Sequence, residues 1–199
     1  DRLGFHSVTP RLIKAMGITA PTPVDSDSLF ADFAESPTAS KLEIAGIEAI
    51  TPDFYKNKDL GIVVKAGGAH PFRTIDEIFV ANGETVARLD GGHAKFAELL
   101  PTMLKDAATI TTEDSKLLLE VTGDARPGTM PLFTADGEPR IWDLTLMAYL
   151  ADPTRTNYGI SYLTERFSAP TVPATGDANE SAATAKALLT MQSVAQEVL

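Results

Sequence analysis

Cysteine is absent from the 199-residue sequence, which excludes disulfides and thiolate metal sites. No apolar run approaches the roughly 20 residues that cross a bilayer, so we expect no transmembrane helix and no membrane partner. The opening residues 1–5 lack the basic start and apolar core of a signal peptide. An initiator Met is also missing, from which we expect a segment of a longer chain. These absences predict a cytoplasmic protein.

A cluster of positive charge is missing as well. The formal net charge is −10, from 27 acidic and 17 basic residues, and the basic residues are scattered. Binding of duplex DNA relies on grouped Lys and Arg side chains that displace counterions. We therefore expect the isolated chain to bind nucleic acid poorly, so that any DNA affinity comes from another part of its protein.

The residues that are present predict one α/β domain. Apolar residues make up 44% of the chain and charged residues 22%, as in ordinary globular proteins. Asn82-Gly83 between two apolar runs predicts a β-hairpin, because both residues tolerate positive φ. Strands are expected over 60–65, 75–80, 84–89 and 107–111. Helices are expected over 7–16, 94–105, 114–121, 142–150, 158–167 and 179–199, with irregular segments at 18–27 and 168–177.

Several side chains could suggest a metal site, but each has a simpler interpretation. His70 and His93 each follow a glycine-containing stretch that is typical of a turn, and His6 stands alone. A loose acidic set surrounds the predicted hairpin, and a solvated sheet face accounts for it better than a catalytic role does. Its members are Asp76, Glu77, Glu84 and Asp90. The glycines match neither a phosphate-binding loop nor a dinucleotide fingerprint.

Three stretches resemble the DNA polymerase I family, in the same order as in that family. Residues 142–155, WDLTLMAYLADPTR, are similar to the family's FDTMLAAYLLDPGR. Residues 158–167, YGISYLTERF, follow them like the family's YSLDDLAERYL. Residues 1–7 resemble the short ERLEF-S-L segment that ends the 5' nuclease portion, and the strand order of residues 60–121 also agrees. Within the first stretch we interpret Asp143 as an N-terminal helix residue favoured by the helix dipole.

The resemblance implies a 3'→5' exonuclease-like domain with a ribonuclease H-like mixed sheet flanked by helices. Residues 21–199 would form this domain, and residues 1–20 the tail of the segment linking to the 5' nuclease domain. In such domains two metal ions remove mismatched 3' nucleotides. The ions lie roughly 3.5–4 Å apart and require several carboxylate ligands.

The family's acidic positions can be checked individually in this sequence. The run that matches its Asp-x-Glu pair, residues 61–67, has no acid and carries Val63, Val64 and Lys65. In the stretch that matches Asn-x-Lys-x-Asp, Leu118 replaces the acid. Residues 179–199 contain neither Tyr nor Asp for the family's Tyr-x-x-x-Asp pair. An apolar surrounding would also make unneutralised metal charge costly, so we expect no catalytic metal in this segment.

We therefore predict a non-catalytic exonuclease-like domain that supports a covalently linked polymerase domain in DNA replication and repair. DNA would be bound through that polymerase domain, which would use Mg²⁺, and we expect the protein to be a monomer. One alternative is an active exonuclease that uses displaced acids such as Asp76, Glu77 or Asp114. The other is an unrelated acidic assembly or binding protein.

Overall fold

The computed structural model describes residues 42–70, 72–122 and 140–198. They belong to one compact unit, and the helix predicted over 7–16 and the loop predicted over 18–27 lie outside them. The predicted boundary between residues 20 and 21 also lies outside them. Within the described ranges, no helix is long and apolar enough to cross a membrane.

A six-stranded sheet with the order β1-β4-β3-β2-β5-β6 forms the centre of the fold. The sheet is mixed: β2–β3 and β3–β4 pair antiparallel, and β1–β4, β2–β5 and β5–β6 pair parallel. The strands are β1 (Ile44–Ala45), β2 (Asp59–Gly67), β3 (Thr74–Ala81), β4 (Val86–Asp90), β5 (Thr109–Thr112) and β6 (Ile141–Asp143). The predicted strands are thus present, with β5 shifted by one or two residues, while β1 and β6 are too short for sequence periodicity to reveal.

The Asn82-Gly83 hairpin is confirmed. Gly83 has a φ of 92°, which a residue with a side chain rarely adopts. The Asn82 side-chain oxygen accepts hydrogen bonds from the amides of Glu84 and Thr85 at 3.2 and 3.0 Å. The turn therefore fixes the register of β3 against β4.

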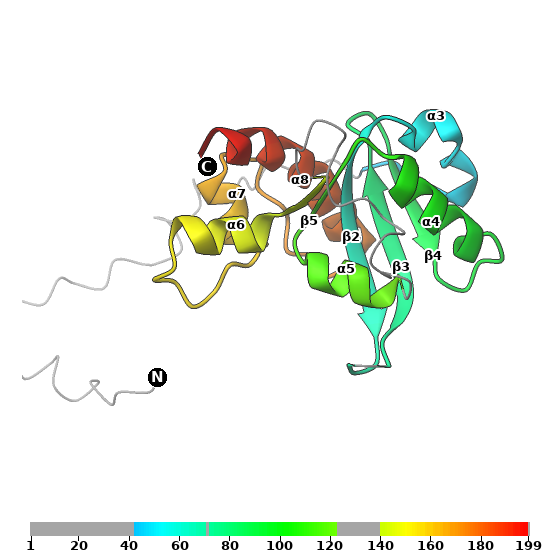
Figure 1. The fold of residues 1–199 in the computed structure, drawn as a ribbon, viewed down its shortest axis with the longest axis horizontal. Helices are drawn as coiled ribbons and strands as arrows, with labels where there is room; N and C mark the ends of the chain where they lie inside the picture. The colour runs from blue at the N-terminus through cyan, green and yellow to red at the C-terminus, as the bar shows by residue number, and fades with distance from the viewer. Residues whose placement is uncertain (1–41, 71, 123–139, 199) are drawn as a thin grey trace, which may run out of the picture. The chain divides into compact units, whose positions relative to one another are not determined.

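Helices cover both faces of the sheet (Figure 1). One face packs against α3 (Pro52–Tyr55), α4 (Phe96–Asp106) and α5 (Ser115–Val121). The other packs against α6 (Leu144–Ala151), α7 (Ile160–Arg166) and α8 (Ala178–Val198). A short 3₁₀ helix, η3 (Ile47–Ala49), follows β1. Side chains alternate along the strands between these two cores, which is the period expected for a sheet buried on both faces.

Four predicted helix starts are early: α4, α6 and α7 begin two residues later than expected, at Phe96, Leu144 and Ile160, and α5 begins one residue later, at Ser115. Trp142 and Asp143 lie in β6, because they pair with Thr111 and Thr112 of β5, and α6 begins only at Leu144. The N-cap of α5 is Asp114. Asp143 still lies at the start of α6, as predicted, where its carboxylate acts as the N-cap.

The stretch that carries the family resemblance folds into α6, a turn and α7. The Tyr158 hydroxyl donates a 2.6 Å hydrogen bond to the carbonyl oxygen of Asp152, and Asp152 accepts one from the Thr154 hydroxyl at 2.6 Å. The Arg155 guanidinium lies 4.4 Å from the centre of the Tyr162 ring. These contacts give the polar and aromatic residues of the stretch a structural role.

Replacing Gly61 with Ala should destabilise the fold. A Cβ at this position of β2 would collide with the carbonyl oxygen of Ala185 in α8. Overpacking of this kind costs about 1–3 kcal/mol, which lowers the melting temperature by roughly 3–10 °C for a chain of this size. Thermal unfolding measures the effect. Gly46→Ala is the control, because nothing lies within 4 Å of a Cβ there, and an equal loss in both variants would contradict the packing argument.

Asp143→Ala should destabilise the protein more than Asp114→Ala does. Asp143 accepts from the amides of Ser115 and Leu146, each at 2.9 Å, and so caps both α5 and α6. Asp114 caps only α5, through the Leu117 amide. Loss of a cap costs about 0.5–2 kcal/mol, so the unfolding free energy in denaturant should fall by roughly twice as much for Asp143→Ala. Equal losses would show that the double cap has no energetic importance.

Candidate functional site

Helix α8 lies directly against strands β2 and β5. Gly61 lies beneath the backbone of Ala185, as the predicted collision of a Cβ shows. Further along α8, Gln192 accepts a 2.6 Å hydrogen bond from the Thr111 hydroxyl and donates one to Thr109 at 3.2 Å. Because Gly61 pairs with Thr111 in the parallel register, α8 contacts β2 and β5 at the same level of the sheet, and Glu180 in its first turn lies close enough to Glu113, after β5, for their charges to interact.

The alternation of side chains places two positions of the predicted site on the α8 face. Val63 is buried in the same core cluster as the residues of α8, whereas Ile62 belongs to the opposite cluster. Lys65, two residues beyond Val63, therefore lies on the α8 side of β2. On β5, Thr111 faces α8, so Glu113 directly after this strand continues on that side.

Four charged residues gather where β2 and β5 end and α8 begins, and we call them the strand-end cluster: Lys65, Glu113, Asp114 and Glu180. The Glu113 carboxyl is half-buried, and this burial raises its pKa above the usual value for Glu. The positive charge of Lys65 opposes the rise, whereas the charges of Glu180 and Asp114 add to it. The cluster therefore combines an exposed cation, Lys65, with a half-buried carboxyl, Glu113, and two further carboxylates.

The remaining predicted positions lie elsewhere. Val64 packs against the opposite core cluster, on the side of α4. Leu118 is fully buried in that same cluster, together with Leu60 and Ile62. Of the residues at the family's acidic positions, the structure thus brings Val63 and Lys65 to the α8 face and leaves Val64 and Leu118 on the other.

Sequence reasoning did not identify Glu113 as part of a site. The strand before it was expected to end at residue 111 and the next helix to begin at residue 114, so Glu113 fell between the two. The signal was its position directly after a buried strand, Thr109–Thr112, whose carboxyl end lies beside that of β2. Glu180 was noticed as one of two acids in the last helix, but without a partner.

A pair of divalent cations does not fit the side chains at these positions. Mg²⁺ takes hard oxygen ligands, whereas Val63 offers no ligand atom and Lys65 carries a positive charge that repels cations. Across residues 42–70, 72–122 and 140–198, no group of three or more His, Cys, Asp or Glu side chains is arranged so that it could hold a metal ion.

The acids proposed as displaced ligands have other contacts. Glu77 forms an ion pair with Arg88, whose Nε lies 2.7 Å from its carboxylate. Asp114 accepts a hydrogen bond from the amide three residues later as the cap of α5. Asp76 lies beside the backbone of β2 at Gly67. Among the other acids near the hairpin, Asp90 accepts from the amide two residues later at 2.8 Å, and Glu84 is exposed.

The two described histidines lie in different parts of the molecule. His70 Nδ1 lies 2.9 Å from the carboxylate of Glu120, between the β2–β3 hairpin and α5. His93 Nδ1 accepts a hydrogen bond from the amide of Lys95 at 3.2 Å, in the turn before α4. His6 lies outside the described residues. Both described side chains therefore have the structural contacts that a turn would provide.

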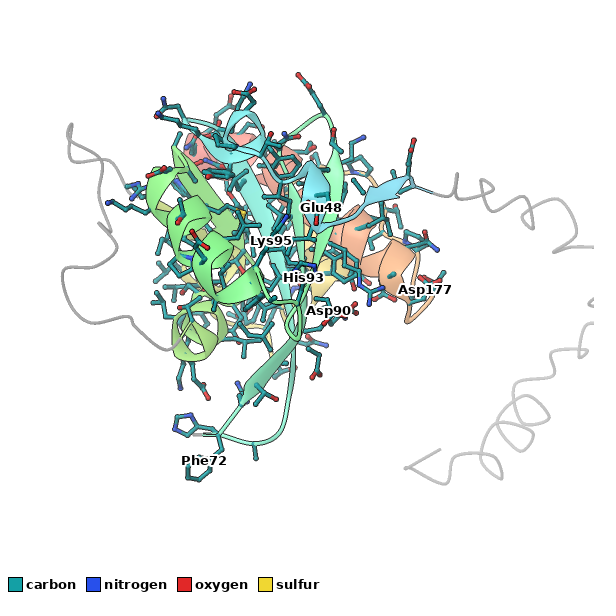
Figure 2. All side chains as sticks on the ribbon, turned by 90° about the vertical axis from the view of Figure 1, so that its right-hand side faces the viewer. Glu48, Phe72, Asp90, His93, Lys95 and Asp177 are labelled. Atoms are coloured by element: carbon teal, nitrogen blue, oxygen red, sulfur yellow. The ribbon has the colours of Figure 1, made fainter. Side chains whose placement is uncertain are left out.

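A pocket of about 380 Å³ lies at the β1–β4 edge of the sheet, and Arg88, Asp90 and His93 form its polar wall. Figure 2 shows Asp90 and His93 near the Lys95–Glu48 ion pair, in which the nitrogen and oxygen are 2.8 Å apart. In the strand order, β3 and β2 separate this edge from β5, and Ala178, the first residue of α8, also lines the pocket.

No protein-family model and no curated protein sequence matches the chain. Solved structures do match it. The structure of the POL domain of Pol1 from M. smegmatis, in complex with DNA primer-template and dNTP, aligns with a TM-score of 0.59 and 15% identity, over 79% of this chain and 27% of that one. The chain thus spans about a quarter of that neighbour's length.

Two further neighbours are similar over most of their own length. The Nibbler EXO domain of Aedes aegypti aligns with a TM-score of 0.54 and 11% identity, over 80% of this chain and 89% of that one. Brucella melitensis NrnC bound to pGG aligns with a TM-score of 0.59 and 15% identity, over 79% of this chain and 82% of that one. The predicted fold is confirmed: a mixed sheet flanked by helices, as in exonuclease domains of the ribonuclease H-like fold. At these identities the likeness establishes the fold alone.

Glu113→Gln should raise the melting temperature at neutral pH and change it less at acidic pH. Because burial raises the folded-state pKa of Glu113, the folded state holds this proton more tightly than the unfolded state does. The contribution of Glu113 to stability is therefore present below the ordinary Glu value of 4.5 and is lost as the pH rises through the folded pKa. The Glu113→Gln variant cannot ionise at this position, so it does not lose this stability as the pH rises.

Thermal unfolding of both proteins from pH 4 to pH 8 checks this expectation. Glu98→Gln, a change in an exposed acid on α4, is the matched control and should show no such trend. A stabilisation by Glu113→Gln that grows toward acidic pH would contradict the sign of the argument.

Proposed function

We propose that this chain is a non-catalytic 3'→5' exonuclease-like domain of a DNA polymerase I. The observation that carries the proposal is the pair of side chains at the end of β2. Where the resemblance places the Asp-x-Glu pair, Val63 and Lys65 lie on the face that packs against α8. The exonuclease fold is thus combined with an aliphatic chain and an amine at the position of the acids.

The chemistry of the family explains why this change matters. Two-metal hydrolysis places two divalent cations roughly 3.5–4 Å apart, which clamp the attacking and leaving oxygens. Carboxylates must offset this concentration of positive charge, and an amine adds to it instead. A domain with Lys65 at this point therefore lacks part of the machinery for phosphodiester hydrolysis, and no hydrolytic step is assigned to its residues.

The function left to such a domain is structural. We infer that it supports a covalently linked polymerase domain in DNA replication and repair, and that this domain supplies the affinity for DNA and uses Mg²⁺. The net charge of −10 supports this division, because an acidic chain without a basic cluster binds a polyanion poorly. The chain itself would need no cofactor and would act as a monomer in the cytoplasm.

A second candidate is an active exonuclease with displaced carboxylates. The observation in its favour is the strand-end cluster, in which Glu113 and Glu180 lie close enough for their charges to interact. The third interpretation, an unrelated acidic binding protein, would be favoured by a sheet of different order, and the ribonuclease H-like fold removes that support.

A nuclease assay separates the first two candidates. The chain is incubated with a 3'-labelled single strand and Mg²⁺ or Mn²⁺, beside an active exonuclease. We expect the label to remain intact, because the acids at the end of β2 are missing. Metal-dependent release of the label at ordinary enzyme levels would contradict the proposal.

The Glu113→Gln/Glu180→Gln double variant makes the assay specific. If the chain releases label and this variant does not, the carboxylates of the strand-end cluster perform the reaction and the displaced-acid alternative is correct. If both release label equally in a metal-dependent way, the proposal is still contradicted, and the acids named first for the alternative, Asp76, Glu77 and Asp114, are the candidates for the reaction.

A further inference from the structure

Helix α6 is apolar on its outward side as well as on the side that packs against the protein. Its eight residues include no charged side chain. Leu144 and Met147 on the inner side are buried in the core cluster shared with α7 and α8. On the outer side Leu146, Tyr149 and Leu150 remain 53%, 48% and 62% exposed, and we call these three residues the α6 face. A helix that is apolar all round is normally buried, so the α6 face lacks the cover that its sequence calls for.

The helix on the opposite side of the sheet follows the usual amphipathic pattern. Helix α4 buries Leu100 and Met103 and exposes Glu98 and Lys105 to solvent. Among the residues that the structure describes, the large apolar side chains that are exposed are those of the α6 face and Phe72, between β2 and β3. Exposed apolar surface is therefore concentrated on α6.

Aromatic side chains extend the α6 face toward α7. The Tyr149 ring lies edge-on to that of Tyr158, with the ring centres 5.9 Å apart, and Tyr158 contacts Tyr162 in the same way at 5.7 Å. Arg155 lies over the Tyr162 ring, and its Nε is 3.6 Å from the carboxylate of Asp152. An apolar centre with aromatic and Arg side chains beside it and a charged pair at its edge has the composition of a protein–protein interface.

The size of this surface favours a partner on the same polypeptide. Stable complexes between separate chains use about 20–30 residues a side, and the α6 face with its aromatic neighbours offers fewer. A tethered domain needs less contact, because the covalent link removes most of the entropic cost of association. Interfaces between domains of one chain accordingly begin at about 600 Å².

The C-terminal half of α8 lies next to the α6 face. Leu188, Met191 and Ala195 share a buried cluster with the inner residues of α6 and α7. Figure 1 shows the C-terminal end of α8 beside these two helices. In the proposed parent protein, polypeptide that continues from α8 into a further domain therefore emerges beside this face.

We propose that the α6 face is the surface on which the covalently linked polymerase domain docks. Leu146, Tyr149 and Leu150 pack against an apolar patch of that domain, since a charged group buried against them would lose its hydration without a counter-charge. The inference rests on the proposed function, which supplies the partner. It goes further, because it names the residues through which this domain supports the polymerase domain.

Single cysteines test the contact, because the chain has no cysteine of its own. Leu150→Cys and Phe72→Cys are made in the isolated chain and in the full-length parent protein, and mass spectrometry follows the reaction of each with a maleimide. Leu150→Cys should react at least about tenfold more slowly in the parent protein, because a covered thiol reacts only when the contact opens. Phe72→Cys is the matched control: Phe72 is 84% exposed at the end of the β2–β3 hairpin (Figure 2), and its replacement should react equally in both proteins.

A maleimide–benzophenone cross-linker on Leu150→Cys of the parent protein identifies what covers the α6 face. We expect cross-links to peptides of the polymerase domain in the same molecule. Cross-links to a second copy, seen as a band of dimer mass on a denaturing gel, would overturn the proposal. Equal reaction of Leu150→Cys in the two proteins, or equal slowing of Leu150→Cys and Phe72→Cys in the parent protein, would overturn it as well.

The nuclease assay and the labelling experiment fail independently. Metal-dependent release of a 3' label would refute the absence of catalysis and leave the protection of position 150 intact. Equal labelling at position 150 would refute the docking face and leave the absence of catalysis intact.

Discussion

The arrangement of the site depends on the close contact between α8 and β2. Because Gly61 has no side chain, the backbone of α8 reaches β2 at Ala185. A buried hydrogen bond between Thr111 and Gln192 holds the helix along β5 as well. This packing brings the first turn of α8, with Glu180, to the ends of two strands that are far from it in sequence.

The same framework serves exonuclease domains of known structure, yet here it presents different chemistry at its active position. In a two-metal site the protein supplies negative charge and the ions supply positive charge. In this chain the exposed Lys65 lies opposite Glu77 in the β2–β3 register, and its positive charge interacts with the carboxyl of Glu113. The apolar Val63 beside it continues the core toward the surface. The fold is therefore combined with side chains at Val63 and Lys65 that offer no metal ligand, as the proposed supporting role beside a polymerase domain requires.

Much of the fold could be predicted from the sequence, because hydrophobic periodicity and the Asn82-Gly83 turn act locally. The two short edge strands could not, since the two residues of β1 and the three of β6 carry no recognisable period. For the same reason Trp142 and Asp143 were assigned to a helix although they pair with β5. The absence of acids from residues 61–67 is visible in the sequence, but the grouping of Glu113 with Lys65 is not, because it arises only when the ends of β2 and β5 lie side by side.

The central claim is that the ends of β2 and β5, beside the first turn of α8, no longer accept the paired cations of an exonuclease site. Anomalous diffraction from a crystal of the protein soaked in manganese tests it most directly, since Mn²⁺ binds where Mg²⁺ does and scatters strongly enough to be located. The account predicts no manganese peak between Lys65, Glu113 and Glu180. Two adjacent peaks there, roughly 3.5–4 Å apart, would contradict it.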